Sequence, residues 1–166
     1  MIIKKNKLQK YLDSLIHYGH KTNELNPKMS SYMLSEENGY HIFDLRKIEE
    51  SLLLSSSILK QKKIDNQKVL FVGTNKIFSS IIKKKAEEID AFYVNNYWLG
   101  GTLTNWNTIQ KIIENLKDLE LKLQQKNNSK KESLKLKKRI YKLNYLFGGI
   151  KNMNSLPDIV IFIDQF

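Results

Sequence analysis

Cysteine is absent from the 166 residues of this chain, so disulfides, zinc–thiolate sites and cysteine nucleophiles are excluded. No apolar run approaches the roughly 18 residues that a membrane-spanning helix requires, and we predict no membrane partner. Residues 1–10 are basic but contain no apolar segment, so we expect neither a signal peptide nor a transit peptide. These absences predict a protein that works in the compartment where it is made.

Arginine, alanine and proline are also scarce, with two residues each, whereas lysine, isoleucine and asparagine number 26, 19 and 16. Arginine is the better bidentate ligand for phosphate, so protein physics does not explain the preference for lysine. Codons for the three abundant residues are AT-rich, and AT-rich genomes are common in organelles and reduced bacteria. The composition therefore favours an organelle-encoded protein of a plastid, then of a mitochondrion, and otherwise one of the bacterial cytoplasm.

Motifs for catalysis are missing as well. The chain has no G-x-S-x-G, no paired-carboxylate motif and no Ser/His/Asp signature, so we predict no enzyme, no cofactor and no small-molecule substrate. Gly73 and Thr74 follow an expected strand, where open α/β sheets bind nucleotides, but they lack both phosphate-loop patterns. A tight turn is the favoured interpretation there. His17 and His20 are spaced for one helical face but have no third ligand nearby, and we predict no metal site.

Positive charge is abundant and unevenly distributed. Lysine and arginine outnumber aspartate and glutamate by 28 to 17, which gives a net charge of +11. Residues 1–10 carry +4 and residues 111–142 carry +7, whereas the remainder is close to neutral. A charge run usually marks a solvated helix face. Two separate clusters beside a neutral body favour contact with a phosphate backbone.

Short apolar runs alternate with helical periodicity through the middle of the chain. Residues 68–73, 91–94 and 158–164 are typical of buried strands, and residues 77–89 of a helix with Phe78, Ile81, Ile82, Ala86 and Ile89 inward. This alternation predicts an α/β fold with a doubly wound parallel sheet.

The N-terminal third is expected to contain two helices and a turn. The spacing of apolar residues predicts a helix over 7–16, and Asp44 is a plausible N-cap for a helix that reaches about residue 60. Extended segments at 32–34 and 40–43 flank Asn38-Gly39, a strong turn pair. Residues 18–31 are expected to be irregular.

Two further helices are predicted between the second and third buried strands. Apolar residues recur at helical spacing from Ile109 to Leu123 and again from Leu136 to Phe147, with a polar break between. This pattern predicts an antiparallel hairpin that ends at a Gly148-Gly149 C-cap. We therefore divide the chain into an α/β domain with a basic tail (1–104), a hairpin insertion (105–147) and a return to the sheet (148–166).

Residues 93–106, with the sequence YVNNYWLGGTLTNW, form the best recognition segment. Aromatic rings stack on nucleotides, and amides and hydroxyls hydrogen-bond to them. For Trp98 and Trp106 core packing is the favoured interpretation. For the asparagines and threonines, contact with RNA or protein is favoured.

Several stretches match a known family in the family's order. They are HYGHKT (17–22), NPKM (26–29), NGYHIFDL (38–45), VLFVGT (69–74), YVN (93–95), WLGGTLTNW (98–106), GGIKNM (148–153) and LPD (156–158). The chain resembles the bacterial and organellar small-subunit ribosomal protein two family. The resemblance implies a flavodoxin-like α/β domain with a protruding helical hairpin, and a structural role that binds small-subunit rRNA and neighbouring ribosomal proteins.

Together the basic clusters, the recognition segment and the resemblance indicate which residues contact RNA. The candidates are Lys4, Lys5, Lys7, His20, Lys21, Asn26, Lys28, Asn95, Asn96, Trp98, Thr102, Thr104, Asn105, Lys130 and Lys131.

The chain departs from the family in two respects. Tyr97 stands where family members usually have arginine, which exchanges a cation for a ring. Family members also usually continue for several dozen residues beyond Phe166, so we expect an unpaired strand edge and an isolated protein of marginal stability. Two other functions stay open, namely nucleotide binding at Gly73-Thr74 and a coiled coil that docks acidic proteins.

Overall fold

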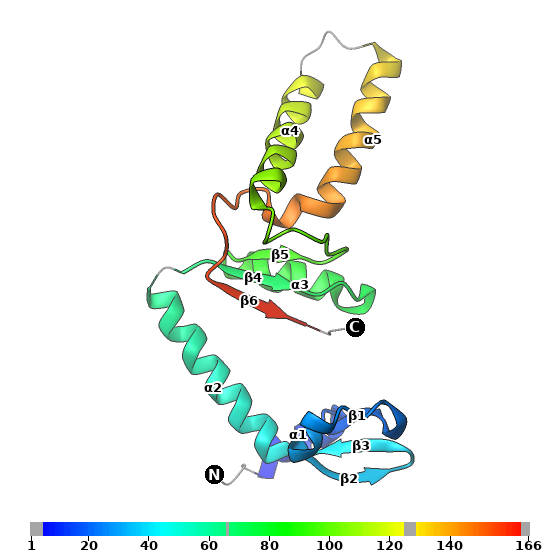
Figure 1. Ribbon diagram of the computed structural model, residues 1–166, viewed down its shortest axis with the longest axis vertical. Coiled ribbons are helices and arrows are strands. Elements are labelled where there is room, and N and C mark those ends of the chain that lie inside the picture. The colour runs from blue at the N-terminus through cyan, green and yellow to red at the C-terminus, as the bar shows by residue number, and fades with distance from the viewer. Residues whose placement is uncertain (1–4, 66, 125–128, 164–166) are drawn as a thin grey trace. The chain divides into compact units, whose positions relative to one another are not determined.

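The computed structural model describes residues 5–65, 67–124 and 129–163 (Figure 1). The chain forms two compact units, Met1–Asp65 (unit 1) and Asn66–Phe166 (unit 2). Each unit has its own sheet, and each is described separately below.

Unit 1 contains a three-stranded antiparallel sheet in the order β1-β3-β2. Its strands are β1 (Tyr18–Lys21), β2 (Met33–Glu37) and β3 (Tyr40–Phe43). Asn38 and Gly39 join β2 to β3 with φ values of 51° and 78°, which confirms the predicted two-residue turn. The irregular segment expected at 18–31 is wrong in part, because Tyr18–Lys21 pairs with β3 as a third strand.

Unit 1 also contains the helices α1 (Lys5–Asp13) and α2 (Leu45–Ile64) and two 3-10 turns, Thr22–Glu24 and Pro27–Tyr32. The side chain of Asp44 accepts a hydrogen bond from the backbone N–H of Arg46 at 2.9 Å, as expected for the predicted N-cap. The helix that starts there runs a turn further than the sequence pattern indicated.

Unit 2 is built on a three-stranded parallel sheet in the order β5-β4-β6. The sequence correctly predicted all three strands and their parallel pairing. In chain order the elements of the unit are β4 (Val69–Val72), α3 (Lys76–Glu88), β5 (Phe92–Val94), α4 (Trp106–Gln124), α5 (Lys130–Phe147), a 3-10 turn (Gly148–Ile150) and β6 (Ile159–Phe162). The mixed α/β class is therefore confirmed. Figure 1 shows α4 and α5 side by side and running in opposite directions.

The core of unit 2 joins the sheet to the base of α4 and α5. Leu70 and Val72 of β4 cluster with Ile109 and Ile113 of α4 and with Phe147 of α5. Because side chains alternate across a strand, the opposite face of the sheet carries Tyr93, which reaches α3 through a hydrogen bond. The sheet is thus covered by helices on both faces.

The apolar face predicted for α3 is wider than the one that the structure buries. Ile82 and Ala86 are 3% and 0% exposed, whereas Phe78, Ile81 and Ile89 are 37%, 55% and 49% exposed. Three strands make a narrow sheet, and α3 packs mainly on β4 and β5. Only one stripe of the helix therefore becomes buried.

The glycine pair after α5 does not have the positive φ of the predicted glycine C-cap. The α-helix does end there, but Gly148 has a helical φ of −54° rather than a positive one. A Cβ on Gly149 would lie 2.1 Å from the carbonyl oxygen of Tyr93 and 2.5 Å from its ring. Gly149 is therefore required because the backbone passes very close to β5.

Candidate nucleic-acid interface

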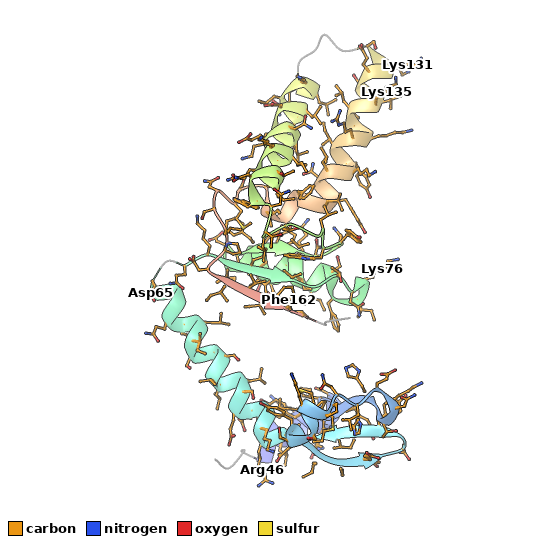
Figure 2. The ribbon with its side chains drawn as sticks, in the orientation of Figure 1. Arg46, Asp65, Lys76, Lys131, Lys135 and Phe162 are labelled. Carbon is orange, nitrogen blue, oxygen red and sulfur yellow. The ribbon has the colours of Figure 1, made fainter. Side chains whose placement is uncertain are left out.

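The basic surface of unit 2 lies on one helix of the α4–α5 pair. Helix α5 carries seven basic residues and one acidic residue, whereas α4 carries three of each. Most of the net positive charge of residues 111–142 therefore lies on α5, which has a net charge of +6. Figure 2 shows Lys131 and Lys135 on the first turns of this helix.

All seven basic side chains of α5 are exposed, and within the described part of the chain none of them forms a salt bridge. They are Lys130, Lys131, Lys135, Lys137, Lys138, Arg139 and Lys142. Cations that lack an internal carboxylate remain available to an external polyanion.

The single carboxylate of α5 is engaged at the start of the helix. Ser129 and Glu132 form a capping box, in which the Glu132 side chain accepts from the Ser129 N–H at 3.0 Å and the Ser129 hydroxyl accepts from the Glu132 N–H at 3.3 Å. These bonds to Ser129 lower the pKa of Glu132. The box fixes the N-terminus of the basic helix.

A second polar cluster holds α4, α5 and the following loop together. Glu120 of α4 accepts hydrogen bonds from the Lys151 ammonium and, at 3.1 Å, from the Asn144 side-chain amide of α5. The Lys151 hydrogen bond is the main reason why the pKa of Glu120 is lowered. This cluster connects the base of the helix pair to the loop that leads into β6.

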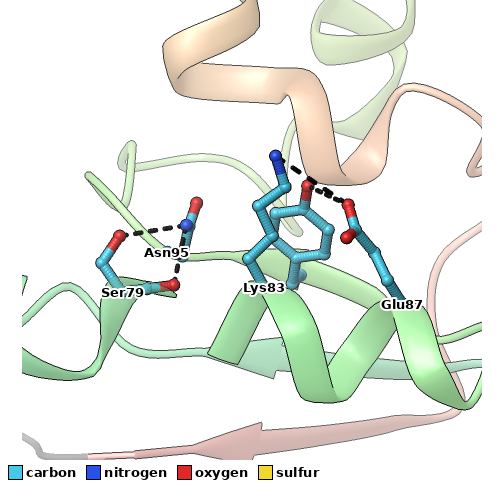
Figure 3. A network of polar contacts seen from close by, with 5 residues as sticks. Ser79, Lys83, Glu87 and Asn95 are labelled. Atoms are coloured by element: carbon cyan, nitrogen blue, oxygen red, sulfur yellow. Dashed lines mark hydrogen bonds and ion pairs between the residues drawn. The ribbon is translucent and has the colours of Figure 1, made fainter. Parts of the chain in front are cut away.

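Asn95 and Asn96, both predicted to contact RNA, bond within the protein. The Asn95 amide donates to the carbonyl and hydroxyl oxygens of Ser79 on α3, each at 3.0 Å (Figure 3). The Asn96 amide donates to the carbonyl of Tyr145 on α5 at 2.9 Å. These two residues tie β5 to the helices on both sides of it.

A neighbouring part of the same network surrounds Tyr93. Its hydroxyl donates to Glu87 of α3 at 3.1 Å, and Lys83 lies 4.0 Å from the same carboxylate (Figure 3). Burial and this hydrogen bond raise the pKa of Tyr93 to about 12. The phenol therefore stays protonated and keeps its role as donor.

The remaining candidates of segment 93–106 divide between packed and exposed positions. Thr102 is 3% exposed and donates to the carbonyl of Leu99 at 2.6 Å, and Trp98 packs on the core with its ring centroid 5.9 Å from that of Phe162. Thr104 and Asn105 are exposed, although the Asn105 side chain accepts from the Thr108 hydroxyl.

The candidates of unit 1 form a separate group. His20, Lys21, Asn26 and Lys28 are exposed, and the side chain of Asn26 caps a 3-10 turn by accepting from the Lys28 N–H. His20 lies 4.0 Å from Glu24.

Lys7, another residue predicted to contact RNA, forms an ion pair within unit 1. Its ammonium donates to Glu49, which is 6% exposed, at 2.5 Å, and this bond raises the pKa of Lys7. The ion pair joins α1 to α2. Lys4 and the side chain of Lys5 lie outside the described residues.

The histidine pair and Gly73, weighed in the sequence for metal and nucleotide binding, lie in local structures of a different kind. His17 and His20 do not share a helical face, because His20 lies within strand β1, and the described residues contain no cluster of three metal-ligating side chains. A Cβ on Gly73 would lie 2.3 Å from Ile82 and 3.1 Å from the Ile163 carbonyl oxygen, so this glycine allows close packing. Among the described helices, none combines the length and apolarity that crossing a membrane requires.

Two tyrosines of α5 are exposed on the basic helix and are not among the residues predicted from the sequence. Tyr141 and Tyr145 are 75% and 47% exposed among the lysines of this helix. Their signal was present in the sequence, because both fall on the side of the helix opposite the apolar residues Leu136, Ile140 and Leu143.

Comparison with known proteins identifies the family. The profile of the family described as ribosomal protein S2 matches residues 11–166. The chain belongs to the ribosomal protein S2 family. It is therefore a ribosomal protein, a structural component and not an enzyme, and the resemblance noted from the sequence motifs is confirmed.

Individual relatives agree with this assignment. The chain is 44% identical over 161 residues to small ribosomal subunit protein uS2c of Guillardia theta, and 41% identical over 161 residues to uS2c of Cyanophora paradoxa. It is 41% identical over 162 residues to uS2 of the cyanobacterium Picosynechococcus sp.. Each alignment covers 95% of this S2 chain, and it covers 68%, 69% and 63% of the respective relatives.

Proposed function

We propose that this S2 protein is a structural constituent of the small ribosomal subunit and binds small-subunit rRNA through helix α5. The observation that carries the proposal is the set of seven exposed basic side chains on α5, none of them in an internal salt bridge within the described residues. The names of the relatives, which are small ribosomal subunit proteins, support the same role.

In this proposal α4 and α5 form an inserted hairpin on a flavodoxin-like domain. Helix α4 buries Ile109, Ile113, Leu116 and Leu119 and is neutral, so it supports the basic helix. The Glu120 cluster and Asn96 fix the base of α5 on the sheet. A fixed base reduces the conformational entropy that binding would otherwise cost.

Other surfaces then serve secondary contacts. The exposed residues His20, Lys21 and Lys28 of unit 1, with Thr104 and Asn105 of unit 2, contact rRNA or neighbouring ribosomal proteins. The uS2c and cyanobacterial relatives, together with the AT-rich residue usage, support a plastid location.

The proposal is tested by the salt dependence of RNA binding. Lys131, Lys135, Lys138 and Lys142 are changed together to glutamine, and the full chain is titrated with cyanobacterial small-subunit rRNA at several salt concentrations. Each phosphate contact contributes about 0.7–0.9 to the slope of log affinity against log salt. We expect the slope to decrease by about 2 to 3.5.

A matched variant separates a defined footprint from a general effect of charge. Helix α3 also carries four lysines, at 76, 83, 84 and 85, and their change to glutamine removes the same charge. We expect this variant to keep most of the slope. Equal losses from both variants, or no loss from the α5 variant, would reject α5 as the main rRNA contact.

A further inference from the structure

The outer side of α5 carries a continuous ridge that is partly apolar. At about 100° per residue, Leu134, Lys138, Tyr141 and Tyr145 fall within roughly 60° of one another. We call these four residues the tyrosine ridge. Leu134, Tyr141 and Tyr145 are 55%, 75% and 47% exposed, so large apolar groups occupy the most solvated side of the helix.

The ridge is not part of the packing between α4 and α5. Phe147 lies in the core with Leu143 and Leu146 packed against it, and Leu136 and Ile140 are half-buried. All of these except Leu146 lie opposite the ridge around the helix. Replacing Tyr141 therefore alters surface chemistry rather than the core.

Charge around the ridge indicates the kind of partner that covers it. The ridge itself contains Lys138, and Lys131, Lys137 and Lys142 flank it. The only carboxylate of the helix is engaged in the capping box. An apolar surface flanked by cations along both of its sides is complementary to a polyanion that also presents flat, uncharged faces.

RNA with unpaired bases has this combination of properties. Its phosphates match the lysines, and its bases stack on aromatic rings. Tyr141 and Tyr145 are one helical turn apart, about 6 Å along the axis, and two splayed bases fit that separation. A fully paired duplex hides its base faces and offers the ridge only phosphates.

We propose that Tyr141 and Tyr145 stack on unpaired bases of the RNA while the neighbouring lysines contact its phosphates. This inference rests on the proposed function and specifies the RNA class that α5 selects. Helix α5 would thus distinguish loops and bulges from regular duplex.

The test compares two tyrosine variants of the full chain. Tyr141 and Tyr145 are changed together to leucine, which keeps helix propensity and apolar area but removes the rings, or together to phenylalanine, which keeps the rings. The probes are a single-stranded RNA oligonucleotide and the same strand annealed to its complement, and binding is followed by fluorescence anisotropy. Circular dichroism checks that both variants retain their helix content.

We expect the leucine variant to bind the single strand at least about 30-fold more weakly, which corresponds to the loss of two base–aromatic stacks. The phenylalanine variant should bind like the wild type, and all three proteins should bind the duplex alike with unchanged salt slopes. Base stacking is wrong if the leucine variant binds the single strand as tightly as the wild type does. It is also wrong if the leucine variant loses as much affinity for the duplex as for the single strand.

Failure of this inference differs from failure of the proposed function. In the first case the lysine variant still lowers the salt slope while the leucine variant has no selective effect. In the second case the wild type binds neither RNA or keeps its slope without the α5 lysines. If the leucine variant loses only its binding to purified small-subunit ribosomal proteins, the ridge is a protein contact and base stacking is wrong.

Discussion

The ion pair between Glu120 and Lys151 gives a quantitative test of how the base of the α4–α5 pair is held. The two side chains are each 27% exposed, so the pair is neither a surface contact nor fully buried. Exposed pairs contribute about 0.2–1 kcal/mol, and removing one partner of a buried pair costs about 3–5 kcal/mol. We expect a coupling free energy of about 1 kcal/mol between these two residues.

The coupling is measured with a double-mutant cycle of Glu120→Gln, Lys151→Met and both changes together. Glutamine keeps an acceptor for the Asn144 amide, and methionine keeps most of the aliphatic stem of lysine, so the cycle isolates the charge interaction. Urea unfolding is followed by tryptophan fluorescence. Trp98 and Trp106 are the two tryptophans of the chain and both lie in unit 2, so the signal reports the unfolding of that unit.

The same cycle at low pH tests the electrostatic origin of the coupling. The Lys151 hydrogen bond lowers the pKa of Glu120 from its ordinary value of 4.5. A carboxylate whose pKa is lower in the folded state stabilises the protein above the unfolded pKa and loses that contribution as the pH falls through the folded pKa. We therefore expect full coupling at pH 7 and a decline below about pH 4.5.

Two results would refute this reasoning. Additive single changes at pH 7 would show that Glu120 and Lys151 do not interact in solution. A coupling that persisted unchanged well below the folded pKa of Glu120 would show that packing, and not charge, connects the residues.

Two further predictions concern the packing around β5. Gly149→Ala should destabilise unit 2 by about 1–3 kcal/mol or more because its Cβ collides with Tyr93. Gly148→Ala should be neutral or stabilise by up to about 1 kcal/mol, because the site is helical and open, and equal urea midpoints for the two variants would contradict this difference. Asn95→Ala should lower stability by about 1–2 kcal/mol through its lost hydrogen bonds to α3. RNA affinity of the folded Asn95 variant should not change, and a selective loss of affinity with full stability would instead support the predicted RNA contact of Asn95.

Local sequence patterns were sufficient to predict the helices, strands and turns whose cause is local. Continuous apolar runs predicted β4 and β6. The run in β4 fits its burial, because a strand covered on both faces needs no polar side, whereas Phe162 of β6 remains 48% exposed. The 3.6-residue period marked α4 and α5, and Asn38-Gly39 marked the turn in unit 1 because its residues adopt positive φ at low cost. The motifs of residues 98–106 and 148–158 were sufficient to indicate the family.

Strand β1 could not be predicted from its own sequence. Tyr18–Lys21 has the sequence YGHK, which is neither strongly apolar nor clearly alternating. It becomes a strand because β3, some twenty residues later, offers a free edge to pair with. Pairing of this kind depends on a distant segment, and no periodicity within the strand itself reveals it.

The contacts of individual polar residues and glycines depend on neighbours that are distant in the sequence. Asn95 and Thr102 have the side chains expected of RNA contacts, yet in the structure each donates to an acceptor within the protein, at 3.0 Å and 2.6 Å respectively. Gly149 was expected as a cap but is required by the approach of Tyr93. The sequence of α5 already contained its charge and the apolar periodicity that places its tyrosines on the outer side, and the structure added how far Tyr141 and Tyr145 are exposed there. A side chain's chemistry is set by its type, whereas its availability is set by the neighbours that folding brings to it.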